Sequence, residues 1–148
     1  MILIRRATSK DITEIIEFQV KMAWETENLH LPTETVTRGV EAVFEDGSKG
    51  EYWVAESEGK VAASLLITFE WSDWRNTKVW WIQSVYVLPE HRRSGIFRSM
   101  YEYIRNESEK CKAAGLRLYV ETSNRIAQST YESLGMSSEH YIMYEWLK

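Results

Sequence analysis

One continuous stretch, residues 78–115, restricts the fold of this chain more than any other part of the sequence. Residues 78–88 (KVWWIQSVYVL) are rich in aromatic and β-branched side chains, which is typical of a central strand, and Pro89 ends the run. A short loop with a glycine and several arginines follows. From Ile96 onward apolar side chains recur at helical spacing until Gly115, which can end a helix. A strand that runs through a basic loop directly into a helix is typical of α/β proteins.

The same periodicities predict the remaining elements. Thr8 and Asp11 stand at capping-box spacing before the first helical stripe. Ser57-Glu58-Gly59-Lys60 is a hairpin turn between two strands, and residues 71–77 are a connection. Strands are expected at 2–6, 51–56, 61–69, 78–88, 116–121 and 140–147, and helices at 12–23, 36–44, 96–114 and 124–134. The order βααβββαβαβ predicts an α/β fold with a mixed central β-sheet flanked by helices.

The length and composition predict one domain, 1–148. A chain of 148 residues can bury one hydrophobic core, and it contains no low-complexity tract or repeat. The first residues, MILIRRATSK, form neither a signal-peptide core nor a membrane span, so a cytoplasmic location without membrane contact is expected. The single cysteine, Cys111, excludes an internal disulfide.

The charges are distributed unevenly. Residues 25–73 contain eleven Asp or Glu against three Lys or Arg, whereas His91, Arg92, Arg93 and Arg98 lie close together. This division suits an anionic cofactor and a cationic acceptor, although each carboxylate can equally be a solvated surface group. A sequence pI near 5.5 and the lack of an extended basic face argue against nucleic-acid binding.

The loop before residue 96 is a candidate anion site. The first amides of a helix have no partner within it, and the helix dipole adds positive potential there. Gly95 permits close approach, while Arg92 and Arg93 can contact a diphosphate. The loop lacks the glycine patterns of ATP-binding and NAD-binding proteins. Taken alone, it could also be a solvated surface loop.

Two motifs resemble those of the GNAT superfamily of acetyl-CoA-dependent N-acetyltransferases. Residues 92–97 (RRSGIF) follow the family's pattern of Arg or Gln, two residues, Gly, one residue, then Gly or Ala, except at the last position, where Phe97 stands. In the next predicted helix the family's Asn, Ala, Tyr and Leu-Gly are matched by Asn124, Ala127, Tyr131 and Leu134-Gly135. The resemblance is strongest over residues 80–136 and implies the GNAT fold.

The resemblance also implies a cofactor site. The backbone of Val85, Tyr86 and Val87 would line the pantetheine arm of acetyl-CoA. Asn124 would bind the pantetheine, and the Tyr131 hydroxyl would lie near the sulfur. The diphosphate would be held by Arg92, Arg93, Ser94, Gly95, Ile96, Phe97 and Arg98. We expect the Phe97 ring to turn into the core, because it lies close to the apolar face of the helix.

Acetyl transfer needs a neutral amine, and an alkylamine has a pKa near ~10.4. Removing its proton at pH 7 costs about 4 to 5 kcal/mol, so a carboxylate base would help. Many relatives carry an acid on the central strand, where this chain has Gln83 and Ser84. Glu121 is the first substitute and Glu70 the second, and for both the alternative is a solvated or salt-bridged residue.

Two further catalytic roles follow from the resemblance. Tyr131 would protonate the departing thiolate, with core packing as the alternative. A backbone N–H near Val85 or Val87 would donate to the carbonyl oxygen. His30, His91 and His140 share no ligand spacing, so no metal is expected.

The acceptor class is left open between a small cationic molecule and a protein amine. A second hypothesis is a catalytically silent CoA-binding sensor or regulatory module, which the missing acid supports. Tryptophans 71, 74, 80 and 81 could hold a cationic amine, or could be core residues and contacts of a homodimer. We favour the structural interpretation, because adjacent strand residues such as Trp80 and Trp81 face opposite sides.

Overall fold

The computed structural model describes residues 1–148 and divides them into two compact units, Met1–Arg117 and Leu118–Lys148. The first unit contains β1 (Ile2–Arg6), α1 (Ile12–Glu27), α2 (Thr33–Glu45), β2 (Glu51–Ser57), β3 (Lys60–Ser72), β4 (Thr77–Val87), α3 (Ile96–Lys110) and β5 (Gly115–Arg117). The second contains α4 (Arg125–Ser133). A single domain spanning both units stays a prediction.

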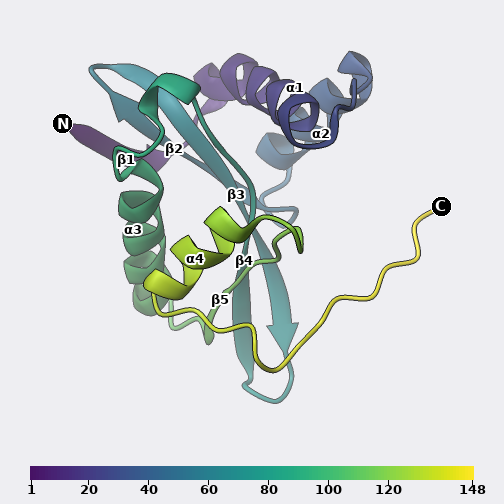
Figure 1. The fold of residues 1–148 in the computed structure, drawn as a ribbon, viewed down its shortest axis with the longest axis vertical. Coiled ribbons are helices and arrows are strands. Elements are labelled where there is room, and N and C mark those ends of the chain that lie inside the picture. The colour runs from purple at the N-terminus through teal and green to yellow at the C-terminus, as the bar shows by residue number, and fades with distance from the viewer. The chain divides into compact units, whose positions relative to one another are not determined.

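The first unit is built on a mixed sheet of five strands in the order β1-β2-β3-β4-β5 (Figure 1). The first four strands are antiparallel, and β5 pairs in parallel with β4. The expected α/β class with a mixed central sheet is confirmed. The expected element order holds up to α4.

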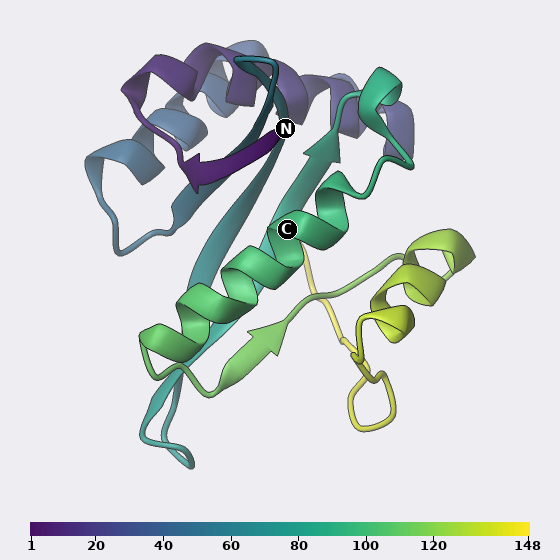
Figure 2. The same ribbon diagram turned by 90° about the vertical axis from the view of Figure 1, so that its left-hand side faces the viewer.

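Helices cover both faces of this sheet (Figure 2). Ile15 of α1 and Val40 of α2 pack with Tyr52 and Val54 of β2 on one face. Successive strand residues point to opposite faces, so Trp53 between them meets α3, where its ring lies 5.7 Å from that of Tyr103. No helix is long and apolar enough to cross a membrane.

The β3–β4 hairpin is longer than the sequence predicts. Residues 71–77 were expected to be a connection, but Trp71 pairs with Lys78 and Ser72 with Thr77. Only the four residues between β3 and β4 form the turn, with Asn76 at a φ of 54°. Cross-strand pairing therefore overrides the polar composition of this segment.

The end of α3 also differs from the expectation. The helix stops at Lys110, and Lys112 takes the left-handed conformation, with a φ of 57°, that the sequence assigns to Gly115. Gly115 instead begins β5.

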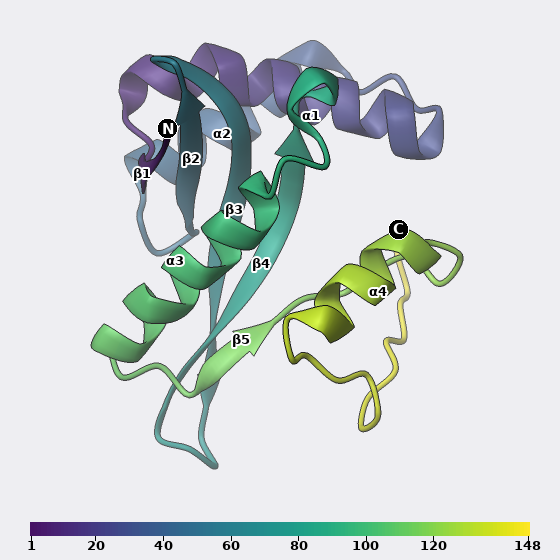
Figure 3. The same ribbon diagram turned by 60° about the vertical axis from the view of Figure 1, so that its left-hand side comes forward.

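Two strand predictions are wrong in extent or altogether. The strand expected at 116–121 is β5, but it ends at Arg117, which pairs with Trp81 of β4. Three residues after Trp81, at Ser84, β4 contains a bulge, and a bulge bends its strand. The final strand expected at 140–147 is absent. Residues 118–148 contain no other strand with which it could pair, and the segment after α4 runs as irregular chain (Figure 3). Large apolar side chains from Tyr141 to Leu147 are exposed.

Candidate anion-binding loop and active site

The loop between β4 and α3 has the geometry of an anion site. Gly95 is the N-cap of α3 with a φ of 82°, and no side chain caps this end of the helix. Arg93 is also left-handed, with a φ of 61°. The Ser99 amide donates to the Gly95 carbonyl at 3.0 Å, so the helical bonds start there and the amides of the preceding turn lie outside the i→i−4 ladder. The sequence-based expectation of a helix N-terminus at Gly95 is confirmed.

The strand that leads into this loop has an open edge. β5 pairs only with residues Val79, Trp80 and Trp81, so no strand borders β4 on that side from Ile82 onward. The Leu88 amide donates to the Ala62 carbonyl at 2.9 Å. Because peptide groups alternate along a strand, the groups of Val87 face the open edge and those of Tyr86 face β3.

A β-bulge lies in the middle of this edge. Gln83 pairs with Leu66 and Tyr86 with Ser64, so Ser84 and Val85 together oppose one residue of β3. Ser84 takes a φ of 51°. The bulge changes which side chains face α1, and it places the buried Tyr86 ring 5.1 Å from that of Phe18. Val87 thus presents its peptide groups to the open edge, whereas the peptide groups of Tyr86 face β3 and its side chain belongs to the core.

The three arginines of the loop have different partners. Arg92 donates from Nη2 to Glu25 at 2.6 Å and from Nε to the Val87 carbonyl at 2.9 Å. Arg98 lies 3.9 Å from Glu102, one turn further along α3. Arg93 is exposed and takes part in no ion pair. Arg93 is therefore the loop guanidinium whose charge no carboxylate offsets.

The remaining loop residues serve the conformation of the site. The Ser94 hydroxyl donates to the His91 carbonyl within the loop. Ile96 is 2% exposed and belongs to the core, so only its backbone is available to a ligand. The Phe97 ring lies 6.5 Å from that of the buried Tyr101. Phe97 is half-buried and contacts its own helix one turn further on, and the expectation that its ring turns into the core stays a prediction.

Three candidate residues lie in the second unit, 118–148. Asn124 caps α4, because its Oδ1 accepts from the Ala127 amide at 3.1 Å. Glu121 accepts the amide of Ser123 at 3.0 Å and the Ser123 hydroxyl, and it is exposed. Burial raises the pKa of the Tyr131 phenol, so its hydroxyl stays protonated at neutral pH. A single site formed by the two units stays a prediction.

The positions near the expected base carry no unpartnered carboxylate. Gln83 donates from Nε2 to the Thr68 hydroxyl at 2.5 Å, and Ser84 is at the bulge. Glu70 forms an ion pair with Arg117 at 2.5 Å, which fits the salt-bridged alternative for this residue. Glu70 is thus held as part of the sheet.

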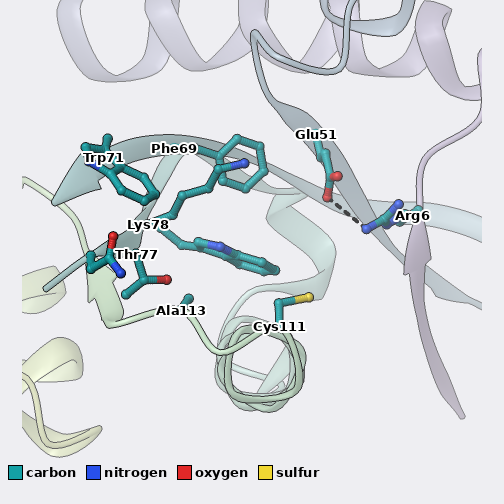
Figure 4. Close-up of a pocket in the computed structure, with 10 residues that line it drawn as sticks. Arg6, Glu51, Phe69, Trp71, Thr77, Lys78, Cys111 and Ala113 are labelled. Atoms are coloured by element: carbon teal, nitrogen blue, oxygen red, sulfur yellow. Dashed lines mark ion pairs between the residues drawn. The ribbon is translucent and has the colours of Figure 1, made fainter. Parts of the chain in front are cut away.

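Two of the four tryptophans meet at a cavity of about 380 Å³ near the start of β4 (Figure 4). Trp71 and Trp80 line it with Phe69, and Lys78 lies with its Nζ 4.9 Å above the Phe69 ring. Trp81 is not among its lining residues, as strand alternation predicts. The 11 residues of β4 span about 35 Å at roughly 3.3 Å per residue, so this cavity lies far from the anion-binding loop. Because a lysine and Arg6 border it, we do not assign it to a cationic amine.

Glu25, the partner of Arg92, was not predicted. It also accepts the Tyr86 hydroxyl at 2.9 Å, so it joins α1 to both β4 and the loop. Its sequence context, an acid near the end of a helix, carries no functional signal. Glu25 gains its partner only in the folded chain, because Arg92 lies 67 residues later in the sequence.

A family model and a similar solved structure both identify an acetyltransferase. The sequence model described as the acetyltransferase (GNAT) family matches residues 11–136. A possible acetyltransferase from Clostridium difficile 630 has a solved structure that is 45% identical, with a TM-score of 0.92 over 100% of this chain and 98% of that one. No protein of curated function matches.

More distant structures share the fold. A predicted acetyltransferase from Clostridium acetobutylicum, solved with acetyl-CoA, is 20% identical over 98% of this chain and 96% of that one, with a TM-score of 0.75. Glucosamine-6-phosphate N-acetyltransferase from Arabidopsis thaliana is 22% identical over 100% of this chain and 99% of that one, also with a TM-score of 0.75.

Proposed function

We propose that this chain, which belongs to the acetyltransferase (GNAT) family, transfers an acetyl group from acetyl-CoA to the amine of a cationic small molecule or of a protein. The observation that carries the proposal is the uncapped N-terminus of α3 at Gly95, directly after a strand with an open edge. An anion site beside a strand edge that no other strand borders suits a ligand with a diphosphate and an amide-containing arm.

The residues present fit such a co-substrate. The exposed Arg93 and the α3 amides would hold the diphosphate, and the backbone of Val85 and the outward N–H of Val87 would pair with the pantetheine arm. Asn124 would contact the same arm. The structure of the C. acetobutylicum protein with acetyl-CoA supports this assignment by analogy of fold. Acetyl-CoA supplies an activated thioester, and the protein supplies position and proton transfer.

In the proposed reaction a C–N bond forms at the acceptor nitrogen and the thioester C–S bond breaks. The acceptor ammonium must first lose a proton, for which Glu121 is the candidate base. Tyr131 is the candidate acid for the thiolate, and its raised pKa keeps the required proton on the phenol at neutral pH. A backbone N–H of Val85 or Val87 is the candidate donor to the carbonyl oxygen.

The acceptor is proposed from charge alone. The excess of acidic residues in 25–73 favours a cationic amine over a nucleic acid or a lipid surface. We also propose that the reaction takes place in the cytoplasm. Relatives by fold include a protein named ribosomal-protein-alanine N-acetyltransferase and the glucosamine-6-phosphate enzyme, so the fold serves both protein and small-molecule acceptors.

The second candidate function is a CoA-binding sensor without turnover. The observation that favours it is the side chain of Gln83, which is bound to Thr68 where many relatives carry an acid. A sensor would bind CoA and acetyl-CoA alike and release no thiol.

A two-step experiment tests both candidates. Calorimetry with CoA and acetyl-CoA on the purified chain comes first, and absence of heat at millimolar ligand rejects both. Thiol release from acetyl-CoA is then followed with polyamines, aminoglycosides, amino acids and peptides. Amine-dependent thiol release identifies the enzyme, whereas binding without release identifies the sensor.

A further inference from the structure

The carboxylate of Glu25 is shared between two side chains that come from the end of β4 and from the loop. Its Oε1 accepts the Tyr86 hydroxyl at 2.9 Å, and its Oε2 accepts Arg92 Nη2 at 2.6 Å. The Arg92 guanidinium also lies 5.5 Å from the centre of the Tyr86 ring. Three residues from three segments thus form one closed network.

Within this network the Arg92 side chain has a structural role. Two of its three guanidinium nitrogens are bound, one to Glu25 and one to the Val87 carbonyl, and Glu25 offsets its charge. Arg92 therefore has little to offer a diphosphate, in contrast to the adjacent Arg93. What Arg92 provides is a tie from the loop back to β4 and α1.

The tie is anchored in the buried core. Tyr86 and Phe18 are each 3% exposed, and their rings are in contact, so α1 and β4 are held together beneath Glu25. Arg92 lowers the pKa of Glu25, and burial together with Glu25 raises the pKa of Tyr86 to about 12. The carboxylate is therefore ionised and the phenol protonated across the neutral range, so both hydrogen bonds persist there.

The loop itself needs such support. Arg93 and Gly95 both have positive φ values, 61° and 82°, and the first is unfavourable for a residue with a side chain. Besides the bonds of Arg92, the loop has a side-chain hydrogen bond from the Ser94 hydroxyl to the His91 carbonyl, and this bond stays within the loop. The Arg92–Glu25 bond is the side-chain bond that joins residues 89–95 to a segment distant in the sequence.

We propose that Glu25 is a positioning residue that, acting through Arg92, holds the loop in the conformation that binds the diphosphate of CoA. This inference rests on the proposed function. A ligand's apparent Kd rises in proportion as the binding-competent fraction of the protein falls. If removal of the tie lowers that fraction to about a tenth, affinity for CoA falls roughly tenfold.

The test compares Glu25→Ala and Glu25→Gln with Glu17→Ala, which removes an exposed carboxylate from the same helix. Calorimetry gives the Kd for CoA, and steady-state kinetics give KM and kcat. Both Glu25 variants should raise the Kd for CoA and the KM for acetyl-CoA, by roughly tenfold for alanine and less for glutamine, which keeps hydrogen bonding. kcat and the KM for the amine should stay within about twofold, and Glu17→Ala should match the wild type.

A double-mutant cycle adds a second readout. If Glu25 acts through Arg92, the Glu25→Ala/Arg92→Ala pair should bind CoA no more weakly than Arg92→Ala alone. Additive losses, an unchanged Kd in Glu25→Ala, or a fall in kcat with no change in Kd would each overturn the inference while leaving the proposed function intact. Failure of the wild type to bind CoA would instead reject the proposed function. Should Glu25→Ala not fold, Glu25→Gln decides the outcome.

Discussion

Gln83 on β4 donates from its Nε2 to the hydroxyl of Thr68 on β3, at 2.5 Å. The two residues lie on the face of the sheet toward α1, next to the bulge at Ser84. This amide occupies the position at which the family resemblance leads us to expect an acid. Because an amide cannot accept the proton of the acceptor ammonium, the residue at position 83 bears directly on the rate of acetyl transfer.

Replacing Gln83 with Glu should increase turnover. The Thr68 hydroxyl can rotate to donate to the new carboxylate, so the side chain keeps its position and becomes a base. We expect kcat/KM for the amine to rise about tenfold near pH 7, a modest share of what general-base catalysis contributes. Thiol release across pH 6 to 9 measures this, with Gln83→Met as the control without a base. An unchanged rate would show that position 83 does not reach the acceptor.

Arg93→Ala should weaken CoA binding. Its guanidinium has no carboxylate partner, and a charge-assisted hydrogen bond to phosphate contributes about 1.5 to 3 kcal/mol, so the Kd should rise at least roughly tenfold. Arg105→Ala, on the exposed side of α3 where Arg105 pairs with Glu109, is the matched control. Calorimetry at two salt concentrations should show a weaker salt dependence for Arg93→Ala alone. Equal affinities of the two variants would argue against a phosphate contact at Arg93.

Gly95→Ala should cost both stability and affinity, whereas Gly135→Ala should cost stability alone. Both glycines have positive φ values, 82° and 89°, and a Cβ at either would meet no atom within 4 Å. The strain is thus conformational and similar, about 1 kcal/mol at each site. Chemical denaturation measures the stability and calorimetry the Kd for CoA. A loss of CoA affinity in Gly135→Ala of the same size would contradict this division.

Asp11→Asn should make the free energy of unfolding depend less on pH in the acid range. Arg5 binds both carboxylate oxygens of Asp11, at 2.8 and 2.9 Å, and holds the pKa of this carboxyl below its usual range. A lowered folded-state pKa contributes stability above the unfolded value near ~3.9, which is lost as the pH falls through the folded value. We expect a loss of about 2 kcal/mol at pH 7 that shrinks below pH 4.

Urea denaturation at several pH values checks this expectation. Asp46→Asn, which alters an exposed pair with Lys49, is the control and should change little. An Asp11→Asn loss that is constant from pH 7 to pH 3 would mean that packing, and not charge, explains it.

Trp80→Ala should destabilise the fold, and Trp74→Ala should not. Trp80 is 5% exposed with its ring 5.6 Å from that of Phe69, whereas Trp74 is 89% exposed at the hairpin turn. Loss of a buried tryptophan costs about 3 to 5 kcal/mol. Urea denaturation measures the difference. A large effect of Trp74→Ala would reveal a contact beyond this single chain.

Features of the fold and site that depend on neighbouring residues could be predicted from the sequence. The aromatic and β-branched run of β4, its end before Pro89, the helical stripe of α3 and the N-terminus at Gly95 all follow from side-chain periodicity and backbone preference. These forces act over a few residues, so the printed order of amino acids is enough to determine them. The same holds for the capping box of Thr8 and Asp11.

Tertiary structure alone decided which side chains meet. Arg92 has the same type of side chain as Arg93, yet one is bound by Glu25, 67 residues away, and the other carries an unpaired charge. In the same way, Thr68 receives Gln83 and Arg117 holds Glu70. The prediction of a strand at 140–147 was wrong for a related reason. A strand needs a hydrogen-bonded neighbour, and no local pattern in the sequence supplies one. Such contacts depend on sheet register and helix docking, which only the folded chain establishes.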